Sequence, residues 1–242
     1  MMCARMNGGR ATGLGVLAGA VLAVAVGTAS ADPVFSGPSP YLSFVDSPFN
    51  GGAFSTFHLE NFEDGLFNTP GATPSAGWIV SSPGPQIDSV DGDDGAIDGS
   101  GAAGRSFYSG GTNTVLTITF DATVLGSLPT HAGIVWTDIG ATFGALPEGF
   151  GSVIFQAFGP GNVLLGSLGP AVLGDGQITG TTAEDRFLGV SNAAGISSIV
   201  ISMPQSGDWE IDHVQYGIAV PGPGALGVVG VLGLAAGMRR RR

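Results

Sequence analysis

Most residues of this chain that could do chemistry are carboxylates, and the densest group lies in one short segment. It contains, interleaved with glycines, Asp88, Asp91, Asp93, Asp94 and Asp98. Ca²⁺ takes about six to eight hard oxygen ligands, which closely spaced carboxylates in a flexible loop can supply. The spacing is not that of an EF-hand, because Gly95 stands where the fifth ligand belongs. The segment therefore predicts either a Ca²⁺ loop or a solvated acidic loop.

Aromatic rings are the second kind of candidate binding group, because the C–H faces of a sugar stack on flat rings. The candidates are Trp78, Tyr108, Trp136, Trp209 and Tyr216. Predicted strand positions favour a core role for most of them. Trp78 and Tyr108 lie nearest to loops and are the better candidates for contact with a sugar.

No pattern in the sequence indicates a catalytic site. His58, His131 and His213 are isolated and lack the spacing of a zinc motif, and no G-x-S-x-G elbow occurs. The single cysteine, Cys3, precedes the apolar N-terminal stretch, so a mature domain has no thiol nucleophile and no disulfide. We expect a protein that is not an enzyme, and keep a secreted hydrolase with dispersed catalytic residues as a third hypothesis.

Charge is distributed very unevenly along the chain. Residues 32–219 hold two of the eight arginines, Arg105 and Arg186, and all 19 acidic residues, which gives a formal net charge of −17 with His neutral. Such a domain repels phosphate backbones, so the charge argues against nucleic-acid binding. It also attracts divalent cations.

The elements that must position these groups are short strands. Within Thr114–Asp121, Leu116, Ile118 and Phe120 alternate with polar residues, which is the period of a half-buried strand. Gly159-Pro160-Gly161 predicts a hairpin turn between two further strands. Strands are expected over Phe54–Leu59, Gly77–Val80, Thr114–Asp121, Gly133–Asp138, Ser152–Phe158, Asn162–Leu168, Arg186–Val190, Ile196–Met203 and Trp209–Tyr216. This pattern predicts an all-β fold, with one β-sandwich or jelly-roll domain over residues 51–219 after a Pro/Ser-rich segment over 32–50.

Residues 1–31 have the three zones of a secretory signal peptide. Arg5 and Arg10 precede an apolar stretch, Leu14–Val26, and a small-residue site ends at Ala31. The apolar stretch is shorter than the ~20 residues of a spanning helix. We predict that signal peptidase cleaves between Ala31 and Asp32, and the alternative is an uncleaved N-terminal anchor.

Residues 220–242 form a second three-part signal. Chain-breaking residues are followed by the apolar segment Ala225–Met238 and then by Arg239, Arg240, Arg241 and Arg242. An arginine block beside an apolar helix stays on the cytoplasmic side, so the domain is expected outside. The tail resembles the PEP-CTERM sorting signal of Gram-negative bacteria, with Pro221, Gly222 and Pro223 at the Pro-Glu-Pro motif and Gly222 in place of the family's glutamate.

The resemblance to PEP-CTERM proteins implies processing by an exosortase-type enzyme. It also implies a transient transmembrane helix in the inner membrane and a final location at the cell surface or outside the cell. A plain C-terminal anchor is the alternative interpretation of the same residues.

The body of the chain carries a further resemblance. Phe62-Glu63-Asp64-Gly65, Thr182–Val190 and Trp209–Gly217 resemble segments of secreted PEP-CTERM domains of unassigned function. The acidic first strand and the final Ile-Asp-x-Val-x-Tyr strand resemble galactose-binding-like jelly rolls, the fold of many carbohydrate-binding modules. That likeness implies a second possible Ca²⁺ site, with Glu63 or Asp64 and Asp212 as ligands, against ordinary surface charge.

Besides the hydrolase, two function hypotheses follow from the sequence. The leading one is an exported, non-enzymatic protein of the cell surface or extracellular matrix, sorted by its C-terminal signal. The alternative is a Ca²⁺-dependent carbohydrate-binding module whose partner is an extracellular polysaccharide.

Overall fold

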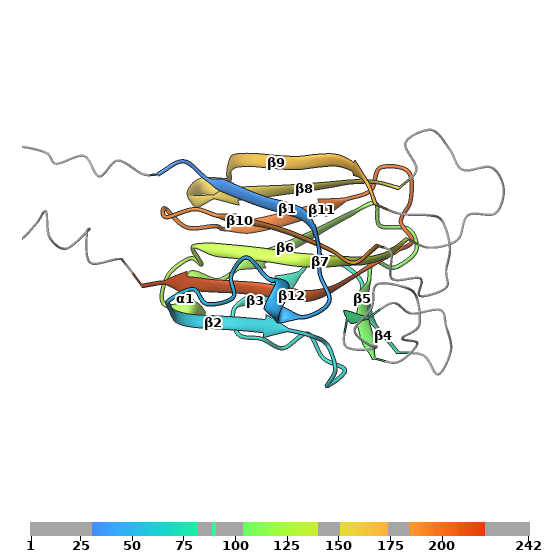
Figure 1. Cartoon of the computed structure of the whole chain (residues 1–242), viewed down its shortest axis with the longest axis horizontal. Coiled ribbons are helices and arrows are strands. Elements are labelled where there is room, and N and C mark those ends of the chain that lie inside the picture. The colour runs from blue at the N-terminus through green and yellow to red at the C-terminus, as the bar shows by residue number, and fades with distance from the viewer. Residues whose placement is uncertain (1–30, 82–88, 91–103, 140–150, 174–183, 221–242) are drawn as a thin grey trace, which may run out of the picture.

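The computed structural model describes residues 31–81, 89–90, 104–139, 151–173 and 184–220, and these form two antiparallel β-sheets (Figure 1). The prediction of an all-β sandwich is confirmed. Apart from residues at their inner borders, both predicted terminal signals lie outside the described residues. Among the residues described, no helix is long and apolar enough to cross a membrane.

The larger sheet has seven strands, built around the long strand β12 (Trp209–Ala219). Its order is β1 (Val34–Pro40), β10 (Arg186–Ser191), β7 (His131–Ile139), β12, β5 (Arg105–Tyr108) and β4 (Trp78–Ser81). β2 (Phe54–Glu60) pairs with the second half of β12, whereas β5 pairs with the first half. β12 therefore lies beside both strands and brings the segment that follows β2 close to the start of β5.

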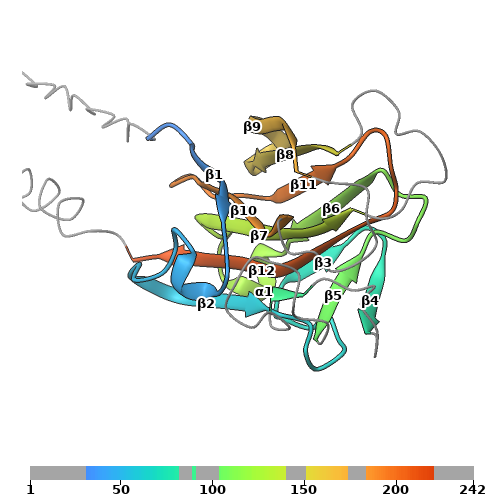
Figure 2. The ribbon, with the colours of Figure 1, turned by 45° about the vertical axis from the view of Figure 1, so that its right-hand side comes forward.

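The smaller sheet has five strands and faces the larger one (Figure 2). Its order is β3 (Ala72–Pro74), β6 (Val115–Phe120), β11 (Ser198–Ser202), β8 (Ser152–Gly159) and β9 (Val163–Val172). β8 and β9 form the predicted hairpin, whose turn, Pro160–Asn162, has positive φ at Gly161 and Asn162. A short helix, α1 (Ala122–Leu125), follows β6.

The hydrophobic core fills the space between the two sheets. Leu116, Ile118 and Phe120 of β6 are at most 4% exposed, as their alternation predicts. Trp136 and Trp209 stack at the centre with ring centroids 5.1 Å apart and an interplanar angle of 22°. The strand alternation therefore predicted the buried face correctly.

A second cluster covers the outer face of the larger sheet. The segment after β1, which includes the 3-10 turn η1 (Phe44–Asp46), lays Tyr41 and Phe49 on Phe187 and Val135. The Phe187 ring packs on two cross-strand glycines, Gly133 and Gly189. A Cβ at either glycine would come within 2.7 Å of the ring, so the glycines leave the space that the ring occupies. Residues 32–50 were expected to precede the domain. They instead belong to it, because they supply edge strand β1 and part of the cluster that covers the larger sheet.

Hydrogen bonds fix this covering segment to β12. The Tyr41 hydroxyl lies 2.9 Å from His213 Nδ1 and accepts a hydrogen bond from Gln215 Nε2 at 2.9 Å. The Ser47 hydroxyl donates to Gln215 Oε1 at 2.6 Å. All four side chains are buried. Their hydrogen bonds therefore hold the segment after β1 against the outer face of the larger sheet.

Candidate functional site

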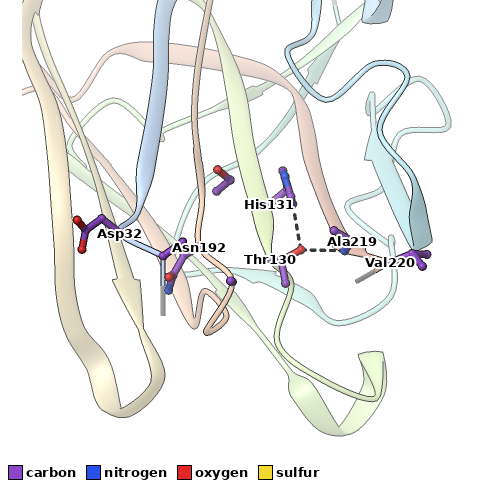
Figure 3. Close-up of a pocket in the computed structure, with 9 residues that line it drawn as sticks. Asp32, Thr130, His131, Asn192, Ala219 and Val220 are labelled. Carbon is purple, nitrogen blue, oxygen red and sulfur yellow. Dashed lines mark hydrogen bonds between the residues drawn. The ribbon is translucent and has the colours of Figure 1, made fainter. Parts of the chain in front are cut away.

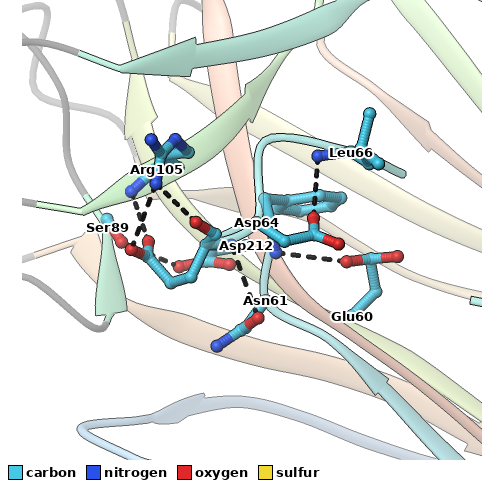
Figure 4. A network of polar contacts seen from close by, with 9 residues as sticks. Glu60, Asn61, Asp64, Leu66, Ser89, Arg105 and Asp212 are labelled. Atoms are coloured by element: carbon cyan, nitrogen blue, oxygen red, sulfur yellow. Dashed lines mark hydrogen bonds and ion pairs between the residues drawn. The ribbon is translucent and has the colours of Figure 1, made fainter. Parts of the chain in front are cut away.

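The structure brings Glu63 and Asp212, from the two ends of the domain, to the start of β5. Figure 4 shows Asp212 close to Ser89 and Arg105 there. Arg105 N–H donates to Glu63 Oε1 at 2.6 Å, and the Arg105 guanidinium donates to the Glu63 main-chain oxygen. The same guanidinium lies 3.8 Å from Glu63 Oε2. A Cβ at Gly104 would lie 3.2 Å from Glu63 Oε1 and 2.5 Å from the Ser89 hydroxyl, so Glu63 and Ser89 are neighbours.

Asp212 is fully buried and holds the segment at Ser89 and Val90. Its Oδ2 accepts hydrogen bonds from Val90 N–H at 3.0 Å and the Ser89 hydroxyl at 3.2 Å. Its Oδ1 accepts from His213 N–H at 2.6 Å. Three donors compensate much of the cost of burying the carboxylate, so Asp212 acts as a hydrogen-bonded tie.

Asp64 points elsewhere and stabilises its own turn. Its Oδ1 accepts from Leu66 N–H at 2.8 Å and its Oδ2 accepts from Asn68 Nδ2 at 2.7 Å, both at exposed positions. The carboxylate that organises this loop is instead Glu60, which accepts backbone hydrogen bonds from Phe62 at 3.2 Å and from Asn68 and Thr69 at 2.9 Å. Glu60 was not among the site residues predicted from the sequence, although an acidic residue directly before a Gly/Asn-rich turn is a recognisable signal.

Within the described ranges, no group of three or more His, Cys, Asp or Glu side chains could hold a metal ion. The five aspartates of the acidic segment, Asp88, Asp91, Asp93, Asp94 and Asp98, lie outside those ranges. The two described residues of this segment, Ser89 and Val90, donate hydrogen bonds to the buried Asp212 carboxylate. Ca²⁺ binding by the segment, or by Glu63 and Asp212, stays a prediction.

The five candidate aromatic rings separate into core and surface. Trp136, Trp209 and Tyr216 are fully buried, which confirms the core interpretation for them. Trp78 is 54% exposed and packs edge-to-face on Tyr108, its partner across β4 and β5, with centroids 5.3 Å apart. Trp78 therefore presents an aromatic surface to solvent.

Polar groups lie beside this pair of rings. The Tyr108 hydroxyl donates to Asp208 Oδ1 at 2.6 Å. The Asn113 amide donates to the Ser109 main-chain oxygen at 2.6 Å, and it lies beside Trp78 because both would touch a Cβ at Gly110. Burial, followed by the hydrogen bond and charge of Asp208 and the charge of Glu210, raises the pKa of Tyr108, so its hydroxyl stays protonated.

We call Trp78, Tyr108, Asn113 and Asp208 the aromatic corner. It combines an open apolar ring with an amide and a carboxylate. A ring face with adjacent hydrogen-bonding groups is the chemistry that a neutral sugar requires.

The three histidines lie in separate surroundings. His58 packs on Tyr216, with ring centroids 5.0 Å apart, and His131 lies against the edges of Phe49 and Phe54. Burial lowers the pKa of both His58 and His131. His213 faces the Tyr41 hydroxyl.

A pocket of about 410 Å³ lies where the described chain begins and ends (Figure 3). Asp32, Thr130, His131, Asn192, Ala219 and Val220 are among its lining residues. The Thr130 hydroxyl accepts a hydrogen bond from Ala219 N–H at 2.8 Å and lies 3.0 Å from His131 Nδ1. The Thr130 hydroxyl thus holds the end of β12 in place. Residues at both predicted signal boundaries, among them Asp32 and Val220, line the pocket.

Comparison with protein-family models, with curated proteins and with solved structures gives no match for this chain.

Proposed function

We propose that this chain is an exported, non-enzymatic protein of the cell surface or extracellular matrix of a Gram-negative bacterium, sorted by a PEP-CTERM-like tail. The observation that carries the proposal is the pair of three-part segments, 1–31 and 220–242, on either side of one acidic β-domain. Signal peptidase and an exosortase-type enzyme are the processing partners that these segments imply.

The arrangement of the domain supports this proposal. Asp32 and Val220 line the same pocket, so both predicted signals adjoin one end of the sandwich. β4 and β5 lie at the opposite end (Figure 1). A domain held to a membrane through residue 220 would therefore display the aromatic corner away from the membrane.

Two charge variants of the tail test the sorting proposal. Replacing Arg239 to Arg242 with Gln is expected to abolish correct sorting, because a positive block fixes the orientation of the apolar segment. Replacement of the same residues with Lys keeps the charge and is the matched control, which should reach the cell surface. If the Gln variant is sorted like the wild type, the tail is not the sorting signal.

A second candidate function is carbohydrate binding, on a sandwich of the galactose-binding-like jelly-roll kind. The aromatic corner favours it, because Trp78 is exposed beside hydrogen-bonding groups although the other two tryptophans are buried. The net charge of −17 favours neutral polysaccharides over anionic ones. In this candidate the Ca²⁺ ligands are the aspartates of the acidic segment, on either side of Ser89 and Val90.

A glycan array read with the wild type, Trp78→Ala and Leu66→Ala tests this candidate. Leu66 is 56% exposed, so its replacement removes a similarly exposed apolar side chain that is not part of the aromatic corner. Binding that Trp78→Ala loses and Leu66→Ala keeps is the expected result, and loss of binding in chelator would add the Ca²⁺ dependence. Absence of binding by the wild type, or equal binding by both variants, contradicts the sugar site.

A further inference from the structure

The five-stranded sheet carries no charged residue on any strand. β3, β6, β11, β8 and β9 contain neither Asp, Glu nor Arg, and the chain has no Lys. Residues 32–219 as a whole carry a net charge of −17. Two copies of this domain therefore repel each other, and the five-stranded sheet is the surface on which close approach brings no like charges together.

Exposed apolar side chains gather at one edge of this uncharged sheet. In β9, Val163 is 62% exposed, Leu164 52% and Val172 74%. On the same outward face, Leu164 lies opposite Phe158 and Ser167 lies opposite Gln156. Leu165 and Leu168 pack on the core, so β9 is anchored while its outer side stays open.

The outer edge of β9 is unpaired in the described part of the chain. β9 pairs with β8 and ends the strand order of its sheet. β1 approaches it across the open side of the sandwich, where the Phe35 ring would touch a Cβ at Gly166, but the two strands do not pair (Figure 2). Proteins usually protect such an edge with charged side chains, and β9 has none.

We propose that β9 is an interface through which two copies of this chain associate, by antiparallel pairing of their outer edges. An antiparallel strand edge is complementary to itself, which is the requirement for a two-fold symmetric contact. A cationic partner finds no countercharge on this sheet, since none of its five strands carries an acidic residue. A second copy satisfies the open N–H and C=O groups and buries the exposed apolar side chains at once.

The shape of β9 limits the strength of this contact. The pairing of β9 with β8 shifts register between Leu164 and Gly166, and Pro170 lacks an N–H, so the pairable run is within Val163–Leu168. So short an interface gives a weak dimer. We expect association at the high local density of a surface layer and in concentrated solution.

Disulfide cross-linking of the full chain tests the interface. Cys3 is the only cysteine, so a Cys3→Ser background leaves no thiol. Leu164→Cys and Ser167→Cys, alone and mixed, cover pairing centred on either residue or between them, because a disulfide needs Cα atoms about 4.4–6.8 Å apart. The control is Val45→Cys, which is 75% exposed in the segment that covers the outer face of the larger sheet.

At least one of these combinations should form covalent dimers about tenfold faster than Val45→Cys under mild oxidation. Adding Val163→Lys to the cysteine variant that cross-links should suppress the dimer, because the new charge opposes strand pairing at the outer edge of β9. Val45→Lys makes the same change of charge at a similarly exposed site and should leave the dimer intact. The proposal is overturned if every combination cross-links no faster than Val45→Cys, or if both lysine variants have equal effects.

Discussion

The hydrogen bonds of Asp212 predict how much stability the domain loses when this residue is replaced with asparagine. Both carboxylate oxygens accept a backbone N–H, Oδ2 from Val90 at 3.0 Å and Oδ1 from His213 at 2.6 Å. In Asp212→Asn one oxygen becomes an NH₂ group, so either orientation of the amide turns a donor toward a backbone donor. An unsatisfied buried donor costs about 1–3 kcal/mol.

That cost converts into a measurable melting shift. For a domain of 150–250 residues, each kcal/mol lowers Tm by about 2–4 °C, so a loss of about 2 kcal/mol predicts a fall of about 4–8 °C. Thermal unfolding followed by circular dichroism measures it, with chelator present so that bound cations do not contribute.

Asp64→Asn is the matched control, because it makes the same chemical change and removes the same charge. Asp64 Oδ1 accepts from Leu66 N–H, and its Oδ2 faces the amide of Asn68, which can rotate to present its oxygen to the new NH₂. We expect Asp64→Asn to change the free energy of unfolding by no more than about 0.5 kcal/mol. Equal melting temperatures for the two variants would refute the role of Asp212 as a tie.

Three further predictions concern stability. Gly133→Ala should lower the free energy of unfolding by about 1–3 kcal/mol, because its Cβ would lie 2.7 Å from the Phe187 ring; equal denaturant midpoints would contradict this. Burial lowers the pKa of His131, so the unfolded chain takes up the proton first and stability falls as pH drops below about 6.5; His131→Gln should weaken this slope in melts at successive pH values, and an unchanged slope would count against it. Ca²⁺ should raise Tm more than Mg²⁺ at equal ionic strength, with a gain of about 2 kcal/mol at ~50 times Kd, and Asp91→Asn with Asp93→Asn should remove that difference if the acidic segment binds the ion; equal melts in Ca²⁺, Mg²⁺ and chelator leave a solvated loop.

Strands with one face in the core could be predicted from the sequence. In β6 and β11, core-facing and outward-facing side chains alternate strictly. Ile118 and Ile201 face the core, and Thr117 and Val200 face outward. Local alternation is a direct consequence of the two-residue repeat of a strand. It therefore needs no knowledge of the partner strands.

β1 and β5 could not be found in this way. β1 contains two prolines and lies at a sheet edge, where a proline costs no ladder hydrogen bond on the open side. In β5, only Phe107 is apolar and faces the core, and Ser106 is buried because its hydroxyl donates to Glu210 on β12. This pairing joins residues about a hundred positions apart, which no local pattern encodes.

Asp121 was assigned to the polar face of the β6 segment, but the structure gives it another role. It is the N-cap of α1, where its carboxylate accepts a hydrogen bond from Thr123 N–H at 2.8 Å. The hydrogen bond from the Thr123 hydroxyl, followed by that from the Thr123 N–H, lowers the pKa of Asp121. The Asp-Ala-Thr sequence carries the cap signal, but a helix of four residues is too short to show an apolar period.

The candidate site was predictable in part. The loop positions of Trp78 and Tyr108 favoured them over the other rings for contact with a sugar. Trp78 is exposed as this requires, and Tyr108 is half-buried under it. The connection of Glu63 to Arg105 and of Asp212 to Ser89 depends on chain segments separated by 42 and 123 positions. Spacing alone could place these residues in the chain, but only the strand order places them together.

The masses of the two ends of the exported protein test the central claim most directly. Peptides from the surface fraction of the native host, identified by mass spectrometry, should begin at Asp32 and lack Arg239 to Arg242. That result would establish removal of the N-terminal signal and processing of the tail in one measurement. A chain that begins at Met1, ends at Arg242 and remains in the cytoplasm would contradict the account.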